Sequence, residues 1–355
     1  MIFRPAQPIT EDDETITAML EAAEVPTLLA SLAYVTGDLS LLREDLKQDP
    51  AKLAEPEAGF SPEQKAAIRV LAREALIRYR DSGCRQAPAP DADTLHRIME
   101  FAVGAAVPVS HRPLLEEELS VTGEDLRAPT WNKDAIAPGR DFMVAIIGAG
   151  MSGLLAAHRL QQAGVPYVII EKNDDVGGTW LQNTYPGCRV DITNHVYSYS
   201  FAQRTNWPFH FSTQDVLLEY FRECADRFDL REHIRFGTEI DRSVWDEQTG
   251  EWVLHGHDST GPVVVRANML ISAVGQLNRP KLPDIAGLDT FTGPVFHSAE
   301  WDHDVDLAGK RVAVIGNGAS AVQFVPIVAR TAASVDIFQR TPNWLFPIPT
   351  YMAPV

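Results

Sequence analysis

Residues 143–153 read MVAIIGAGMSG, and this short stretch decides the fold class. An apolar, β-branched run leads directly into three glycines with the spacing G-x-G-x-x-G, and a helical pattern over 154–162 follows. Glycines at this spacing permit a tight strand-to-helix turn and let backbone N–H groups approach a pyrophosphate at the helix N-terminus. The stretch therefore predicts a dinucleotide-binding loop made by Gly148, Gly150 and Gly153.

A carboxylate completes this first glycine motif. The next apolar run, residues 167–170, leads into Glu171, which follows Gly148 by 171 − 148 = 23 residues. A carboxylate at the end of the second strand can accept hydrogen bonds from the hydroxyls of a ribose. We therefore expect the first motif to bind a dinucleotide whose ribose carries no phosphate.

The same motif is used a second time, with a different charge. Residues 311–321 read RVAVIGNGASA, in which Gly316 and Gly318 are followed by Ala at the third position. Gln339 stands 339 − 316 = 23 residues after Gly316, and Arg340 comes next. A guanidinium can pair with a 2′-phosphate through charge-assisted hydrogen bonds. The second motif therefore predicts NADPH, although Arg340 could also be an ordinary solvated charge at a strand end.

Two dinucleotide motifs in this order predict FAD followed by NADPH, as in a flavoprotein that takes hydride from NADPH. Short apolar runs alternate with helical patterns, which is typical of β-α-β units and a parallel sheet. The candidate strands are 143–147, 167–170, 269–274, 311–315 and 335–338. We predict an α/β fold with two Rossmann-like domains, the second of them incomplete.

The first part of the chain has a different pattern and predicts an all-α extension. Ser61-Pro62-Glu63-Gln64 is a capping box with Pro at the first helical position, and Gly83 ends the helix that it starts. Further helices are expected over 93–103 and 113–119. The acids of residues 11–14 could in principle hold a cation, but acids that open a helix are explained by its dipole, and we expect no metal.

These patterns divide the chain into five expected segments. They are a helical domain (1–126), a linker (127–140), the first part of an FAD-binding domain (141–290), a second linker (291–310) and an NADP-binding domain (311–355).

The composition excludes several classes of protein. The chain has 31 Lys and Arg residues and 48 Asp and Glu residues, which gives a formal charge of 31 − 48 = −17. A negative charge of this size repels the phosphates of nucleic acids. The chain has three cysteines and no CxxC, which argues against a disulfide framework and a zinc ribbon. The N-terminus does not resemble a signal peptide, and the longest apolar run is shorter than the ~20 residues of a membrane span. We expect a cytoplasmic protein with no membrane partner.

Residues 291–302 resemble the FxGxxxHxxxW(P/D) fingerprint of type I Baeyer–Villiger monooxygenases. The defined positions are filled by Phe291, Gly293, His297, Trp301 and Asp302. A second pattern of the family is also complete, with GGTW at 177–180, YPG at 185–187 and then Asp191. Related flavin N-oxygenases end the fingerprint in Tyr, so Trp301 favours the Baeyer–Villiger family. The helical extension is similar to that of the 4-hydroxyacetophenone monooxygenase branch.

The resemblance implies an activity. In the family, NADPH reduces FAD, O2 adds to give a C4a-peroxyflavin, and this peroxide inserts one oxygen into a ketone to give an ester or lactone. The substrates would be O2 and a small ketone, such as an aryl ketone. The resemblance further implies that His297 and Trp301 have a conformational role in the linker and transfer no proton.

Residue roles are also implied by position. Arg189 and Asp191 would face the nicotinamide and take part in catalysis. The residues implied to contact FAD are Gly148, Gly150, Gly153, Glu171, Gly178, Thr179, Trp180, Asp191, Tyr197 and the main chain near Ile240. The residues implied to hold NADPH are Gly316, Gly318, Ser320, Arg340 and Thr341.

The chain departs from the family by ending at Val355, where family members continue. We expect an incomplete chain with weak or absent turnover and low solubility on its own, whose peroxide-stabilising arginine would lie beyond Val355. Three alternatives stay open: an oxygenase of amines or sulfides, a non-catalytic nucleotide-binding remnant, and an interaction module built on the helices of 1–126. A disulfide-type flavin reductase is disfavoured because no CxxC lies near the first motif. The helical domain could also support a homodimer.

Overall fold

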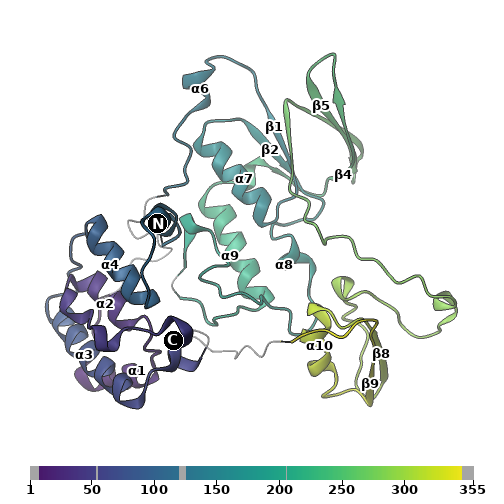
Figure 1. Ribbon diagram of the computed structural model, residues 1–355. Coiled ribbons are helices and arrows are strands. Elements are labelled where there is room, and N and C mark those ends of the chain that lie inside the picture. Colours follow the sequence, from purple (N-terminus) through teal and green to yellow (C-terminus); the bar gives the residue numbers. More distant parts are fainter. Residues whose placement is uncertain (1–7, 53–54, 120–124, 205, 346–355) are drawn as a thin grey trace. The chain divides into compact units, whose positions relative to one another are not determined.

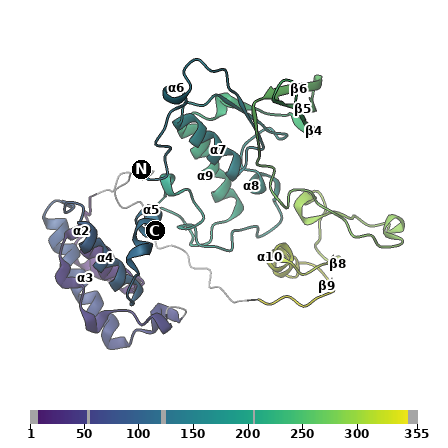
Figure 2. The ribbon, with the colours of Figure 1, turned by 45° about the horizontal axis from the view of Figure 1, so that its top comes forward.

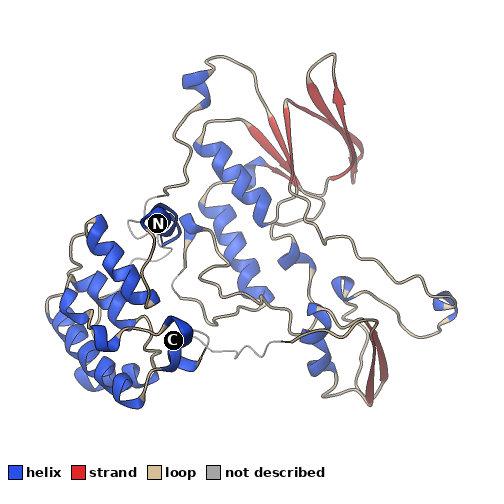
Figure 3. Ribbon diagram, in the orientation of Figure 1, coloured by secondary structure: helices blue, strands red, loops and turns tan. Residues whose placement is uncertain are grey.

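The computed structural model describes residues 8–52, 55–119, 125–204 and 206–345. These residues form two compact units, shown along the chain in Figure 1 and by secondary structure in Figure 3. The first unit contains the described residues of 1–126 together with those of 200–206. The second contains the described residues of 127–199 and those from Trp207 onward. The segment 200–206 therefore clusters with the helices, although it lies within 141–290 in sequence.

The first unit is entirely helical. Its α-helices are α1 (Asp13–Ala22), α2 (Leu28–Thr36), α3 (Pro62–Asp81), α4 (Ala92–Val103) and α5 (Arg112–Leu119). Its short 3₁₀ helices are η1 (Leu39–Leu41), η2 (Glu44–Leu46), η3 (Pro50–Lys52), η4 (Pro56–Gly59), η5 (Val109–His111) and η6 (Ser200–Ala202). One apolar cluster joins α1 to α4 with η1 and η2, because these α-helices present aliphatic residues at helical spacing. Its buried members include Ile16, Leu20, Leu29, Leu32, Ile68, Ala72, Ile98 and Phe101.

The ends of α3 follow from its sequence. The Ser61 hydroxyl accepts a hydrogen bond from the Gln64 amide (3.2 Å), and the Gln64 side-chain oxygen accepts one from the Ser61 amide (3.0 Å). Gly83, with φ of +79°, follows the helix directly after its C-cap Ser82. The predicted capping box and the predicted end of this helix are both confirmed.

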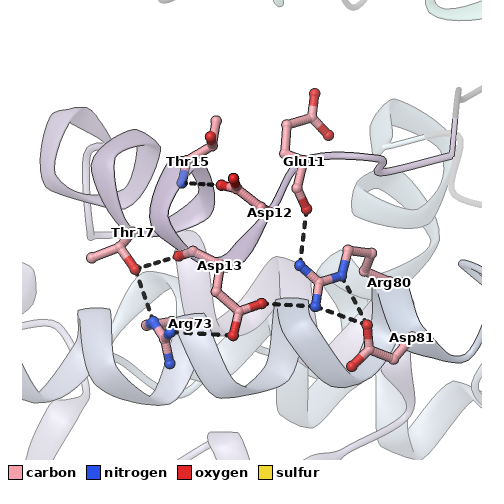
Figure 4. A network of polar contacts seen from close by, with 8 residues as sticks. All are labelled: Glu11, Asp12, Asp13, Thr15, Thr17, Arg73, Arg80 and Asp81. Atoms are coloured by element: carbon pink, nitrogen blue, oxygen red, sulfur yellow. Dashed lines mark hydrogen bonds and ion pairs between the residues drawn. The ribbon is translucent and has the colours of Figure 1, made fainter.

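The acidic run at residues 11–14 serves α1 and its contact with α3 (Figure 4). Asp12 caps α1 by accepting a hydrogen bond from the Thr15 amide at 2.8 Å. The Asp13 carboxylate pairs with Arg80 of α3 at 2.8 Å, and Arg80 also donates to the Glu11 carbonyl at 2.9 Å. Among the described residues, no group of three or more His, Cys, Asp or Glu side chains could hold a metal ion. These acids therefore have a structural explanation.

A four-stranded parallel sheet forms the centre of the second unit, in the order β3-β2-β1-β7. Its strands are β1 (Val144–Ile147), β2 (Tyr167–Ile170), β3 (Ile234–Arg235) and β7 (Met269–Ser272). The helices α7 (Met151–Gln162) and α9 (Gln214–Arg227) pack beside each other, and α7 covers β1 and β2. Because this sheet is covered, Ala145, Ile146 and Ile169 are fully buried. The predicted strands are confirmed, but those at 143–147 and 269–274 are shorter than expected.

A three-stranded antiparallel sheet was missed by the sequence analysis, which expected parallel strands only. It consists of β4 (Glu239–Asp246), β5 (Glu251–Asp258) and β6 (Gly261–Ala267) and lies beside the parallel sheet (Figure 2). Leu254 and Ala267 join a buried cluster with Ala145 and Ile170. One face of this sheet is exposed, and its apolar runs, such as 252–254 in β5 and 263–265 in β6, are only three residues long.

The second glycine motif lies in a smaller α/β element. Strands β8 (Arg311–Ile315) and β9 (Ser334–Phe338) pair in parallel, as predicted, and α10 (Ala319–Val328) connects them. The remaining short helices of this unit are α6 (Lys133–Ile136), α8 (Thr179–Gln182), η7 (Arg231–His233), η8 (Leu288–Thr290) and η9 (Ser298–Glu300). In the described part of the chain, no helix combines the length and apolarity needed to cross a membrane.

Candidate functional site

Two glycines of the first loop, Gly148 and Gly153, have no room for a Cβ. Gly148 has φ of +102°, and a Cβ at this position would lie 2.6 Å from the carbonyl oxygen of Ala273. A Cβ on Gly153 would lie 1.9 Å from the carbonyl oxygen of Gly148. Gly150 is the N-cap of α7 and has no side chain to occupy the amides of the first turn. The loop therefore leaves a helix N-terminus available to an anion.

The carboxylate of Glu171 lies beneath this loop. Its Oε2 accepts a hydrogen bond from the Ala149 amide at 2.7 Å. Its Oε1 accepts from the amide and side-chain nitrogens of Asn173 at 2.9 and 2.6 Å. Glu171 is only 5% exposed, so these donors stabilise an otherwise costly buried carboxylate. A carboxylate accepts about four hydrogen bonds, which leaves capacity on Oε2 for a ribose hydroxyl.

The segment that follows Glu171 returns to the glycine loop. Gly178 has φ of +52°, and a Cβ there would lie 2.9 Å from the Cα of Gly150. Thr179 begins α8, and the next residue, Trp180, is buried. The Trp180 indole donates to the Tyr197 hydroxyl at 3.2 Å, and burial raises the pKa of Tyr197. The structure thus brings the predicted residues Gly150, Gly178, Trp180 and Tyr197 together.

Ile240 lies at the start of β4, where the pairing with β5 shifts register between Ile240 and Arg242. Its side chain packs against the apolar cluster between the two sheets. The amide of Thr238, just before β4, donates to the carbonyl oxygen of Glu171 at 2.9 Å. The main chain leading to Ile240 therefore lies next to the acid of the first motif.

The second glycine loop is more open. Gly316 has φ of +106°, and a Cβ on Gly316 or Gly318 would meet no described atom within 4 Å. Gly318 is the N-cap of α10, and Ser320 lies in its first turn. Burial raises the pKa of Tyr185 to about 12, and a hydrogen bond with Ser320 opposes that rise.

The two motifs differ most at the residue after their second strand. Gln339 Oε1 accepts from the Asn317 side-chain nitrogen at 2.6 Å, so a neutral amide stands where Glu171 stands in the first motif. The same nitrogen donates to the Thr341 carbonyl at 3.2 Å. Arg340 between them is exposed. A cation without a neighbouring acid at this position suits a phosphate rather than a free ribose.

Arg189 and Asp191 lie on the loop of residues 185–191, which α10 contacts through Gln323. The Arg189 amide donates to Gln323 Oε1 at 3.2 Å, and its carbonyl accepts from Gln323 Nε2 at 3.0 Å. The Tyr185 hydroxyl donates to the same Gln323 oxygen at 3.0 Å. The Asp191 side chain is exposed and close enough to Tyr185 and Tyr197 to raise the pKa of both hydroxyls.

The fingerprint segment packs on α10 through its tryptophan. The ring centroid of Trp301 lies 5.3 Å from that of Phe296 and 5.2 Å from that of Phe324. The ring centroid of Phe324 in turn lies 6.2 Å from that of Tyr185. His297 Nδ1 accepts from the Ala299 amide at 3.1 Å and caps η9, and the expected conformational role of His297 stays a prediction.

The other fingerprint residues shape turns. Asp302 accepts from the Asp304 amide at 3.0 Å. Phe291 is 62% exposed, and a Cβ on Gly293 would collide with its ring at 2.6 Å. The fingerprint therefore joins α10 mainly through Trp301.

Three residues of the site were missed by the sequence analysis: Asn317, Gln323 and Phe324. Gln323 and Phe324 follow Ser320 at spacings of three and four, which places them near its face of the helix. That spacing was the available signal, but it does not tell which loop the face meets.

A family model described as flavin-binding monooxygenase-like matches residues 141–348, more than half of the chain. The chain therefore belongs to the flavin-binding monooxygenase-like family. A Baeyer–Villiger monooxygenase of Streptomyces coelicolor is 48% identical over 205 residues, which cover 58% of this chain and 39% of the relative. An uncharacterized monooxygenase of Sinorhizobium fredii is 36% identical over 343 residues, which cover 96% of this chain and 51% of the relative.

The solved structures agree with these relatives. The crystal structure of OTEMO in complex with FAD and NADP matches with a TM-score of 0.52 and 38% identity, covering 58% of this chain and 40% of that one. The resemblance to Baeyer–Villiger monooxygenases and the predicted α/β class are both confirmed by these matches. The chain spans about two-fifths to one half of the length of the curated relatives described here.

Proposed function

We propose that this chain binds FAD at its first glycine motif and NADPH at its second, and serves a cytoplasmic Baeyer–Villiger monooxygenase. The overall reaction would convert a ketone, O2, NADPH and a proton to an ester or lactone, NADP⁺ and water. The observation that supports this proposal is the pair of strand-loop-helix motifs with opposite polarity, Glu171 in one and Arg340 in the other, in a chain of this family.

The residues around the first motif fit FAD. A helix N-terminus faces the space above glycines that admit no Cβ, and the partly satisfied Glu171 carboxylate lies beside it. When bound, FAD supplies the redox centre that takes hydride and reacts with O2. The chain itself would bind the pyrophosphate at α7, hold the ribose through Glu171 and enclose the flavin side with Trp180 and Tyr197.

The second motif would hold NADPH in a comparable way. The first turn of α10, with Gly318 and Ser320, would bind the pyrophosphate, while Arg340 and Thr341 would meet the phosphorylated ribose. Arg189 and Asp191 would face the nicotinamide from the loop that α10 holds. Asp191 would there accept hydrogen bonds, and Arg189 would place a positive charge beside the nicotinamide.

Reconstitution with FAD tests the first half of this proposal. The purified chain is incubated with FAD, desalted and examined for retained flavin absorbance, with Gly153→Val as the control because a Cβ there collides with the loop. We expect flavin to stay with the wild type and to be lost from the variant. A colourless wild-type protein would contradict FAD binding and favour the non-catalytic alternative.

Substrate comparison tests the second half. We expect NADPH to reduce the bound flavin faster than NADH, and any oxygenation that the chain supports to be greater with an aryl ketone than with a thioether. Preferred oxygenation of the thioether would instead indicate a heteroatom oxygenase of the same fold.

The helical unit could supply a homodimer contact, since Met19, Val70 and Leu114 leave apolar surface exposed on it. Sedimentation of the wild type against a Met19→Ser, Val70→Ser double variant measures this, and an unchanged monomer in both would contradict it.

A further inference from the structure

Gln323 is the polar contact between α10 and the loop of residues 185–191. Its side-chain oxygen accepts from the Tyr185 hydroxyl (3.0 Å) and the Arg189 amide (3.2 Å), while its nitrogen donates to the Arg189 carbonyl (3.0 Å). One side chain thus pairs with both backbone groups of a single residue, as a neighbouring strand would. A neutral primary amide offers a donor and an acceptor side by side, which neither a carboxylate nor a thioether does.

The backbone of the loop approaches α10 closely at the same place. Gly187 has φ of +80°, and a Cβ there would lie 2.5 Å from the Ile327 side chain and 3.1 Å from the Gln323 carbonyl oxygen. The rings of Tyr185 and Phe324 meet beside this contact. The loop therefore lies against one defined face of the helix, and Gln323 fixes its register there.

The helix and the loop that Gln323 joins each carry a residue of a different proposed nucleotide site. Ser320, one helical turn before Gln323, lies in the first turn of α10, where the proposed function places the NADPH pyrophosphate. Two residues after Arg189 comes Asp191, which the same proposal places against FAD and nicotinamide. A shift of α10 on binding NADPH would thus move the Arg189 backbone through two hydrogen bonds and the Tyr185 side chain through a third.

We propose that Gln323 is a positioning residue that couples the two nucleotide sites, so that FAD on the first motif increases the affinity of the second motif for NADP(H). This inference rests on the proposed function. By thermodynamic reciprocity, NADP⁺ must tighten FAD binding by the same factor. Gln323 itself would touch neither nucleotide. It would act through the Tyr185 hydroxyl and the Arg189 backbone.

Gln323→Met is the principal variant, because methionine keeps the length and helix propensity of glutamine and removes all three hydrogen bonds. Gln248→Met is the matched control, since Gln248 is exposed in the turn between β4 and β5. The Kd of NADP⁺ is measured by calorimetry with and without saturating FAD. We expect FAD to tighten NADP⁺ binding by about fivefold or more in the wild type and the control, and by under about twofold in Gln323→Met. The affinity for each nucleotide alone should change by less than about threefold.

Hydrogen–deuterium exchange of the nucleotide-free protein supplies a readout that does not depend on the ligands. The Arg189 amide loses its acceptor in Gln323→Met, so a peptide covering 185–191 should exchange about tenfold faster, while β1 stays unchanged. Gln323→Glu adds a rescue test. Its carboxylate lacks the donor to the Arg189 carbonyl, whereas the protonated acid restores a donor. Coupling in this variant should therefore increase as the pH falls.

The outcomes separate the two proposals. Wild-type protein that binds neither nucleotide would overturn the proposed function and the coupling role with it. Two results would overturn the coupling role alone, provided that both nucleotides bind normally. One is the absence of coupling in the wild type. The other is full coupling in Gln323→Met together with unchanged hydrogen exchange.

Discussion

The carboxylate of Glu171 holds the first glycine loop through the Ala149 amide and is buried while doing so. Glu171→Gln replaces an acceptor-only group with one that carries an NH2, which must face one of these N–H donors. We expect the free energy of unfolding to fall by about 1.5–3 kcal/mol and FAD affinity to fall about tenfold or more.

Chemical denaturation and flavin titration measure these two effects. Glu219→Gln, at an exposed position of α9, is the control and should change neither. An FAD affinity equal to that of the wild type would show that Glu171 does not contact the ribose.

We predict that the choice of NADPH over NADH depends on Arg340. It is exposed, and the preceding Gln339 is neutral and bound to Asn317. Arg340→Ala should weaken NADPH binding by about tenfold or more and leave NADH binding nearly unchanged, because only NADPH carries the 2′-phosphate. Titration of both nucleotides measures this, with the exposed Arg330→Ala as control. Equal losses for NADPH and NADH would identify Arg340 as a general surface charge.

At the scale of the element, the capping box sets where α3 begins. Ser61→Ala removes the acceptor for the Gln64 amide and should destabilise the helical unit by about 1 kcal/mol. Ser61→Asp keeps an acceptor and should restore most of that loss. Hydrogen exchange of peptides within α3 reports the change directly. Equal exchange in all three proteins would mean that packing alone defines this helix end.

A second link at this scale is Asp175, which ties the segment after β2 to Arg222 of α9 (2.7 Å) and Arg231 of η7 (2.9 Å). Burial raises its pKa, but the hydrogen bonds from Arg231, the Val176 amide and Arg222 lower it more, so the native pKa lies below 3.8. A carboxyl group whose pKa is lower in the folded than in the unfolded protein stabilises the fold at any pH above its unfolded-state pKa. This stabilisation is lost as the pH falls through the folded-state pKa.

The wild type should therefore melt at a higher temperature than Asp175→Asn, by a constant margin above about pH 5. The margin should shrink below pH 3.8. Thermal melts of both proteins across this range measure it. A margin that grows toward acid would have the opposite sign and would contradict the role given to the two arginines.

At the scale of the whole molecule, the second α/β element leaves apolar side chains in water. Trp344 is 97% exposed and Leu345 64%, and Ile337 and Phe338 of β9 are also exposed. Large apolar side chains exposed to water in this number promote association. We expect concentration-dependent self-association of the chain, reduced by Trp344→Ser with Leu345→Ser.

Analytical ultracentrifugation measures this association. Trp131→Ser is the control, because Trp131 is an exposed tryptophan elsewhere in the same unit. Equal sedimentation of the wild type and the double variant over a range of concentrations would contradict the prediction.

Local chemistry was sufficient to predict much of this protein. Glycines that no Cβ can replace, such as Gly148 and Gly153, identify the first nucleotide loop, and the capping box at Ser61 identifies a helix start. The parallel strands β1, β2, β7, β8 and β9 carry short apolar runs and were found within one or two residues, whereas the two-residue strand β3 was missed, and β8 and β9 are mostly exposed rather than buried. Each of these features depends on residues close together in the chain, so the sequence contains the whole signal.

Only the tertiary structure decided which distant residues meet. The contact of Gln323 with Arg189, the pairing of Arg80 with Asp13 and the packing of Trp301 on Phe324 join positions far apart or on separate elements. The antiparallel sheet of β4 to β6 belongs here too, since its half-exposed strands carry a weak local pattern. Such contacts depend on how whole elements pack, and one sequence without its fold does not specify which surfaces face each other.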